Sequence, residues 1–130
     1  MLGMSDVKLF RMADLNLKPN DDGIVTAPVV NRRYSTGLGA GIGVFEKCEI
    51  EWTVTYDEVL FIKEGKFTLQ VGDKTYRAGP GDILWIPKDT PLVYEARGKV
   101  VFFYAVWPVD KSPSTSQTTE YPTAAPEQAV

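Results

Sequence analysis

The sequence predicts an all-β domain, a sandwich or a barrel, from three observations. Short segments rich in β-branched and aromatic residues recur at intervals of about 8–12 residues, with turn residues between them. Residues 66–71 alternate strictly between polar and apolar side chains, as in a strand with one buried face. Between residues 23 and 107, no window of about 12 residues has a convincing helical period. A β-rich core is therefore expected.

The N-terminal stretch is ambiguous, because the apolar residues among residues 5–20 fit a strand or a short helix equally well. A turn follows at residues 20–23, Asn-Asp-Asp-Gly, whose residue types tolerate left-handed backbone angles. The segments Lys66–Val71 and Lys74–Ala78 are joined by Gly-Asp and predict a β-hairpin.

Two further apolar segments, Ile83–Ile86 and Val100–Val106, are bounded by glycine or proline and predict strands buried on both faces. From residue 112 serine, threonine and proline dominate, a composition that cannot bury enough surface to order itself. We therefore expect an N-terminal arm over residues 1–22, a single β-domain over 23–110 and a flexible tail over 111–130.

The composition of the chain argues against nucleic acid and membranes as partners. The 130 residues carry a net charge of −3, which argues against nucleic acid, because such binding needs a basic face. The longest apolar run, Val100–Trp107, is too short to span a bilayer, and residues 1–11 do not resemble a signal peptide. A cytoplasmic protein without a membrane partner is expected.

Histidine and cysteine usage excludes whole classes of chemistry. The chain has no histidine, which excludes histidine-based catalytic triads, histidine general bases and imidazole metal ligands. Its single cysteine, Cys48, can form neither an intrachain disulfide nor a thiolate metal cluster.

Two spaced motifs identify the type of β-domain. In the first, Glu58 is followed after six residues by Gly65; in the second, Gly81 is followed after five residues by Pro87. Their order, their separation and the hairpin between them resemble the two signature motifs of the cupin superfamily. The resemblance implies an RmlC-like jelly roll, the double-stranded β-helix barrel, as a single domain.

The metal ligands of that superfamily are missing here. The two histidines of the first motif would fall at Trp52 and Val54, or one residue earlier at each position, and the histidine of the second falls at Leu92. Only the glutamate, Glu58, survives, and one carboxylate is a poor site for a transition metal. No metal or other cofactor is expected, although a hard cation held by Glu58 with Glu51 or hydroxyl groups remains an alternative.

A closer resemblance lies within the superfamily, to the cupin domain of ethanolamine utilization protein Q. It rests on short matching segments between residues 37 and 110, at residues 39–41, 52–53, 56–58, 64–65, 78–79, 81–82, 86–88 and 107–108. The Trp-Thr and Tyr-Asp-Glu segments, which replace the lost histidines, are the most specific. The resemblance implies a metal-free or atypical pocket, a tendency to dimerise, and a link to ethanolamine catabolism and acetate kinase activity.

Glu58 is the strongest candidate for chemistry. If the alternation is unbroken, Trp52, Val54, Tyr56 and Glu58 face the barrel interior. A carboxyl group in a largely apolar barrel should have a raised pKa, which suits a general acid or base. We therefore expect Glu58 and Tyr56 to be catalytic. A structural carboxylate held by neighbouring hydroxyl groups is the alternative.

Four further residues are candidates for substrate contact, although each also fits a purely structural role. Trp52 would form a pocket wall, and Tyr94 shares the face of Leu92 two residues before it. Tyr104 places a hydroxyl in an otherwise apolar strand, where a polar cavity would explain it. Asp57 should point away from Glu58.

The sequence is compatible with three functions. The first is a metal-independent enzyme acting on a small polar metabolite by acid–base chemistry, of isomerase, lyase or dehydratase type. The second is a non-catalytic module that binds or senses a small molecule, and the third is the acetate kinase activity implied by the resemblance. We also expect a homodimer in which the apolar N-terminal segment, residues 7–17, packs across the neighbouring barrel.

Overall fold

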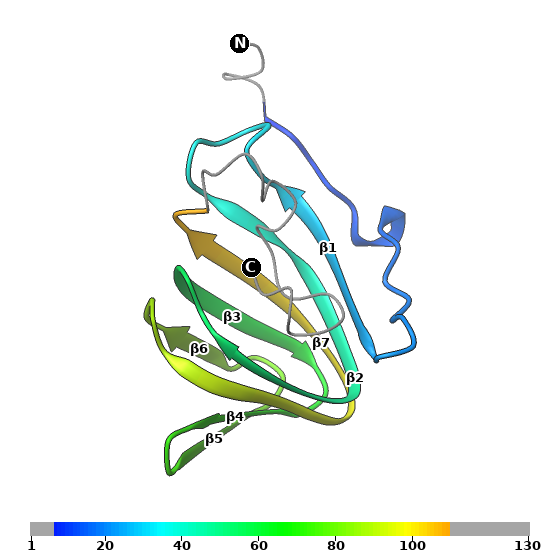
Figure 1. The fold of residues 1–130 in the computed structure, drawn as a ribbon. Coiled ribbons are helices and arrows are strands. Elements are labelled where there is room, and N and C mark those ends of the chain that lie inside the picture. Colours follow the sequence, from blue (N-terminus) through cyan, green and yellow to red (C-terminus); the bar gives the residue numbers. More distant parts are fainter. Residues whose placement is uncertain (1–6, 110–130) are drawn as a thin grey trace.

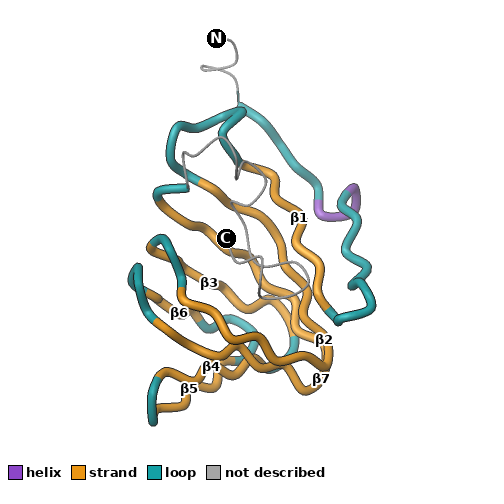
Figure 2. Tube along the Cα trace, in the orientation of Figure 1, coloured by secondary structure: helices purple, strands orange, loops and turns teal. Residues whose placement is uncertain are grey.

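The computed structural model describes residues 7–109, and strands make up most of this part of the chain (Figure 2). The N-terminal stretch is extended apart from one short 3-10 helix, η1 (Met12–Asp14). The all-β prediction is confirmed, whereas the predicted tail, residues 111–130, lies outside the described residues. The strands are β1 (Ile24–Val30), β2 (Gly39–Thr53), β3 (Asp57–Glu64), β4 (Phe67–Val71), β5 (Lys74–Ala78), β6 (Ile83–Ile86) and β7 (Pro91–Trp107).

All seven strands belong to one curved sheet with the order β1-β2-β7-β3-β6, and the β4–β5 hairpin attaches to β7. The long strands β2 and β7 pair from Gly39 opposite Val106 to Thr53 opposite Pro91. Their register shifts at Lys47, whose φ is 52°, and such a bulge bends a ribbon sharply. In Figure 1 both strands turn together, so that the two halves of the sheet enclose one interior.

Glycines before and within β2 give the side chains of β7 room to pack. A Cβ atom on Gly43 would clash with the ring of Phe102, and one on Gly37 would clash with the ring of Trp107. The missing side chains therefore seat two aromatic rings against the backbone.

Four aromatic rings form the centre of the core. Phe45, Phe67, Tyr94 and Phe102 are each at most 1% exposed, and their ring centroids lie 4.9–5.9 Å apart in the contacting pairs. Such tilted and stacked pairs add about 0.5–1.5 kcal/mol each beyond the burial of their area. The cluster fixes the position of Tyr94, the one member with a polar end.

The prediction that Ile83–Ile86 is buried on both faces is wrong. Ile86 is 1% exposed, but Ile83 and Trp85, which point the other way, are 67% and 61% exposed. The same prediction for Val100–Val106 fails at Phe103 on β7, which is 39% exposed. An outward face made of large apolar residues has the same composition as a strand buried on both faces, so the sequence does not distinguish them.

The N-terminal arm leaves apolar side chains exposed. Val7 and Leu9 are 96% and 73% exposed, while the ring of Phe10 contacts the ring of Tyr34 at a centroid distance of 5.9 Å. Within residues 7–109, no helix has the length and apolar character needed to cross a bilayer.

Candidate functional site

The segment that leads from β2 into β3 places alternate side chains in the interior. Trp52, Val54, Tyr56 and Glu58 are all buried, with exposed fractions of 7% or less, which confirms the predicted alternation. Backbone hydrogen bonds to the loop before β7 hold this segment in place: the Val54 N–H donates to the Thr90 carbonyl, and its own carbonyl accepts from Asp89 N–H.

Glu58 lies at the centre of the interior wall. It belongs to β3, between β6 and β7, where it pairs with Ile86 and Val106. The residue is fully buried, and it is the one Asp, Glu, Lys or Arg side chain in the described core. Its Oε1 accepts a hydrogen bond of 2.9 Å from the hydroxyl of Tyr94, which comes from the half of β7 that pairs with β4. This bond joins the two halves of the barrel.

Burial controls the protonation of this pair. Loss of hydration raises the pKa of Glu58 from its ordinary 4.5 to about 8, and the hydrogen bond from Tyr94 lowers it by less. The pKa of Tyr94 is raised well above 10, first by burial and then by the charges of Glu58 and Tyr56. The direction of this shift agrees with the expected rise in the pKa of Glu58, and a pKa of about 8 favours the neutral carboxyl group at neutral pH.

Two buried polar atoms of the site lack a partner among the described residues. They are Oε2 of Glu58 and Nε1 of Trp52. Oε2 accepts a hydrogen bond when the carboxyl group is ionised and can donate one when it is protonated, whereas the indole Nε1–H can only donate. Buried polar atoms are satisfied in most proteins, and an ordered water or a ligand is the usual partner where no protein group serves.

The remaining sequence-predicted residues divide into two groups. Tyr56 and Tyr104 are 3% and 1% exposed and belong to the interior, as expected. The hydroxyl of Tyr104 lies 2.8 Å from the point that a Cβ of Gly41 would occupy. Asp57 forms the second group, because it does not share the interior. Its Oδ1 accepts a hydrogen bond of 2.9 Å from the backbone N–H of Lys88, which ties β3 to the loop after β6. Its contact with a substrate stays a prediction.

The sequence did not identify the groups that hold Tyr94 against Glu58. The sequence leaves Tyr56, Tyr94 and Tyr104 as equal candidates for the neighbour of Glu58. In the structure Tyr94, 36 residues away in the chain, donates the hydrogen bond. Phe45 and Phe67 contact its ring. Alternation in β4 marks Phe67 as an inward residue, but no local pattern pairs it with Tyr94.

Acidic residues do not cluster around Glu58. Within residues 7–109, no three Cys, Asp or Glu side chains come together in a way that could hold a metal ion. Glu51, the partner considered for a hard cation, is exposed, whereas Glu58 is buried.

The bent β2–β7 ribbon and the inward glutamate of the first motif, Glu58, define the chain as a cupin. A solved RmlC-like cupin from Shewanella frigidimarina has the same fold, with a TM-score of 0.66 and 13% identity, over 78% of this chain and 91% of that chain.

The chain belongs to the EutQ family, whose model, "Ethanolamine utilisation protein EutQ", matches residues 2–113. A crystal structure of an ethanolamine utilization protein Q from Salmonella typhimurium has a TM-score of 0.74 and 24% identity, covering 82% of this chain and 89% of that chain. The Escherichia coli protein named "Acetate kinase EutQ" is 29% identical over 75 residues, 58% of this chain. The chain spans only 32% of the length of that relative.

Proposed function

We propose that the barrel binds a small polar molecule and that Glu58 acts on it as a general acid and base. The carrying observation is a fully buried carboxyl group whose pKa lies at about 8. A group that titrates near the working pH can donate and recover a proton efficiently. The reaction class is an isomerisation, elimination or dehydration, in which one group protonates or deprotonates a carbon or oxygen of the substrate.

The hydrogen bond from Tyr94 determines which oxygen carries the proton. Oε1 of Glu58 accepts from the Tyr94 hydroxyl, so the acid proton lies on Oε2. Oε2 is the oxygen that has no partner among the described residues. A substrate oxygen or nitrogen next to Oε2 would accept this proton, and the resulting carboxylate would retain one hydrogen bond, from Tyr94. Tyr56 and Trp52 are the further candidates to orient the substrate.

We propose that this chemistry is independent of metal. The inward positions where a cupin motif carries histidines hold Trp52, Val54 and Leu92, whose side chains offer no lone pair suited to a metal ion. In the alternative alignment these positions hold Glu51 and Thr53, which are exposed while Glu58 is buried. One protonated carboxyl group is an equally poor ligand. The residues present therefore do not fit a transition metal.

The test is a ligand screen in the presence of a chelator. Small amines, carboxylates and sugars are tested for a rise in melting temperature. We expect at least one compound to stabilise the parent and not Glu58→Gln, and mass spectrometry then shows whether it is converted. A binding module would stabilise without product. Equal stabilisation of both proteins, or a requirement for metal, would contradict the role of Glu58.

Phosphoryl transfer is the second candidate, because the Escherichia coli relative carries the name acetate kinase. Such transfer needs several cations or backbone amides around the phosphates, usually with Mg²⁺. Incubation with acetate, ATP and Mg²⁺ tests it directly. Formation of ADP that depends on acetate would favour this candidate over the acid–base reaction.

We also propose that the chain forms a homodimer through an apolar outer face. This face, on strands β3, β6 and β7, consists of Val59, Phe61, Ile83, Trp85, Phe103 and Trp107, which are 37–67% exposed. Val59 lies opposite Trp85, and Phe61 lies opposite both Ile83 and Phe103, so their side chains share one side of the sheet.

A second copy of the chain suits this face. These six side chains expose on the order of 500 Å² of apolar surface, much of the ~800 Å² that each partner contributes to a standard interface. The six residues are uncharged, so two identical faces meet across a two-fold axis without repulsion. The exposed N-terminal arm would extend the contact.

Trp85→Glu should convert the dimer to a monomer, because it places a charge in the centre of the proposed contact. Light scattering at micromolar concentration measures the mass. The matched control is Tyr76→Glu on β5, where the parent side chain is 44% exposed outside this face. A monomeric parent protein, or a dimer that survives Trp85→Glu, would contradict the proposed interface.

A further inference from the structure

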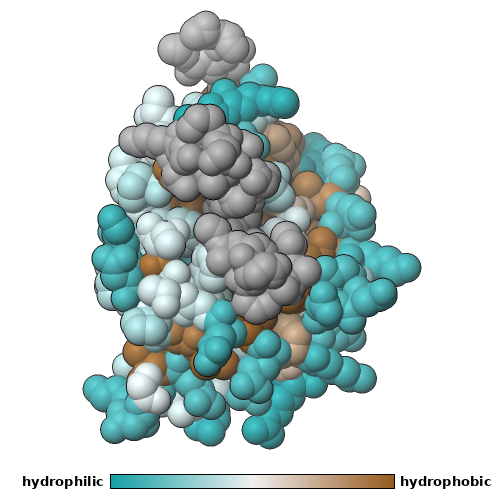
Figure 3. Space-filling model, viewed as in Figure 1, coloured by the Kyte–Doolittle hydropathy of each residue, from teal (hydrophilic) through white to brown (hydrophobic). Residues whose placement is uncertain are grey.

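A second surface feature lies outside the barrel interior. It is a half-open groove of about 710 Å³ between the β4–β5 hairpin and the bend of β7. Hydrophilic side chains gather at this end of the molecule (Figure 3, lower edge). The volume is within the range of about 300–1,000 Å³ that small-molecule sites occupy.

The groove faces away from Glu58. On β4, Thr68 points into the groove, while its neighbours Phe67 and Leu69 are buried in the core. On β7, Glu95 lines the groove, while the preceding Tyr94 is buried. Because successive side chains of a strand point to opposite faces, the two strands separate the groove from the interior site.

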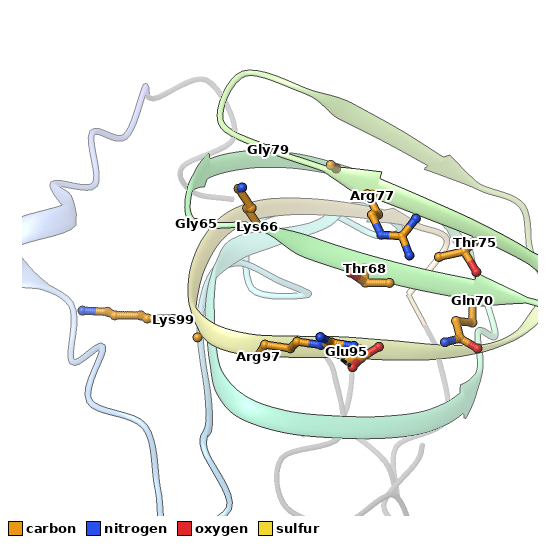
Figure 4. A pocket seen from close by; sticks show the side chains of 12 residues that line it. Gly65, Lys66, Thr68, Gln70, Thr75, Arg77, Gly79, Glu95, Arg97 and Lys99 are labelled. Carbon is orange, nitrogen blue, oxygen red and sulfur yellow. Dashed lines mark hydrogen bonds and ion pairs between the residues drawn. The ribbon is translucent and has the colours of Figure 1, made fainter.

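The lining is strongly basic. Four cationic residues, Lys66, Arg77, Arg97 and Lys99, are among the lining residues, and Glu95 is the one carboxylate among them. In Figure 4, Arg77 and Arg97 lie beside Thr68, whereas the side chain of Lys99 extends away from it. The chain as a whole is acidic, with a net charge of −3. Positive charge is thus concentrated at this groove, which favours an anionic ligand.

Thr68 lies at the middle of the groove between two charged neighbours. Its cross-strand partners are Arg77 on β5 and Glu95 on β7, and Figure 4 shows these side chains on either side of it. Arg97 Nε donates to Glu95 Oε2 at 3.2 Å. That ion pair uses only Nε, and the side chain of Arg97 is 88% exposed. The terminal nitrogens, which suit a carboxylate fork, therefore face solvent.

We propose that this groove binds a small polycarboxylate, a molecule with two or three separated carboxylate groups. The cations come from three places, the turn before β4, strand β5 and strand β7, so their charges are spread along the groove. Separated carboxylates match this distribution better than one compact anion does. The hydroxyl groups of Thr68 and Thr75 and the amide of Gln70 also suit carboxylate and hydroxyl groups. The described lining has no aromatic ring on which a nucleobase could stack.

The test is titration calorimetry of the full chain with citrate, with glucose 6-phosphate and sulfate as comparisons at matched ionic strength. We expect citrate to bind more tightly than the other two anions. Arg77→Gln should weaken citrate binding about tenfold or more, because a charge-assisted hydrogen bond is lost. Lys74→Gln, which removes the same charge from β5 outside the lining, should leave binding within about twofold.

A steric variant provides a second readout. A Cβ atom on Gly98 would meet no other atom within 4 Å, so Gly98→Leu should fold normally and fill part of the groove. We expect an unchanged melting temperature and weaker citrate binding. The proposal is overturned if sulfate binds as tightly as citrate, or if glucose 6-phosphate binds more tightly than citrate. It is also overturned if Lys74→Gln weakens citrate binding as much as Arg77→Gln does. Unchanged binding in both Arg77→Gln and Gly98→Leu would overturn it as well.

Discussion

Replacing Glu58 with glutamine should make the protein more stable at pH 8 and remove most of the dependence of its stability on pH between 5 and 8. The parent carries a carboxyl group that is fully buried and whose pKa is raised to about 8 by loss of hydration. Glutamine has nearly the same shape, and its carbonyl oxygen can accept the hydrogen bond from Tyr94, but it never ionises.

The sign of the effect follows from proton binding. Glu58 has an ordinary pKa of 4.5 in the unfolded chain and of about 8 in the folded one, so between these values the folded state binds more protons. The stability gained from the neutral carboxyl is fully present below pH 4.5 and is lost as the pH rises to about 8. The loss is on the order of 4–5 kcal/mol, at about 1.4 kcal/mol per pKa unit.

Urea unfolding of the parent and Glu58→Gln at pH 5, 6, 7 and 8 measures this difference. Glu51→Gln is the matched control, because Glu51 is exposed on β2. The free energy of unfolding of Glu51→Gln should show the same dependence on pH as that of the parent. If Glu58→Gln destabilises the protein at pH 8, Glu58 is an ionised structural carboxylate, and the catalytic assignment fails.

Tyr94→Phe should destabilise the protein by about 1–3 kcal/mol. The fall in stability that accompanies ionisation of Glu58 should also continue to a higher pH than in the parent, beyond pH 8. The substitution keeps the ring in its contacts with Phe45 and Phe67 but removes the donor to Oε1 of Glu58. That hydrogen bond lowers the pKa of Glu58, so its removal raises the pKa further.

The same unfolding series checks this prediction, carried to pH 9. Tyr76→Phe removes a hydroxyl from a 44% exposed residue on β5 and should change neither stability nor its pH dependence by a measurable amount. A Tyr94→Phe protein with the pH dependence of the parent would show that the hydrogen bond has no influence on the ionisation of Glu58.

Local patterns predicted the local parts of this structure well. The hairpin expected at Lys66–Val71 and Lys74–Ala78 is found as β4 and β5, because its turn and its alternation both lie within a few residues. The inward position of Glu58 also followed from alternation, since a strand repeats every two residues.

Features that depend on distant pairing were not predictable. Strand β7 is 17 residues long and includes Gly98 and several charged residues, so the sequence indicated a strand only over its apolar half. The bond between Tyr94 and Glu58 requires the bend of the β2–β7 ribbon, which brings its two halves together. The exposure of Trp85 depends on which elements cover β6, and the composition of β6 alone does not reveal it.

The most direct test of the acid–base assignment is the ionisation of Glu58 itself. Carbon-13 NMR of protein labelled at the glutamate side-chain carboxyl, with Glu58→Gln to assign the signal, follows this group from pH 4 to pH 10. We expect the carboxyl signal that is absent from Glu58→Gln to titrate with a pKa of about 8. Titration of Glu58 near 4.5 would contradict the account, because the carboxyl would then carry no proton to donate at neutral pH.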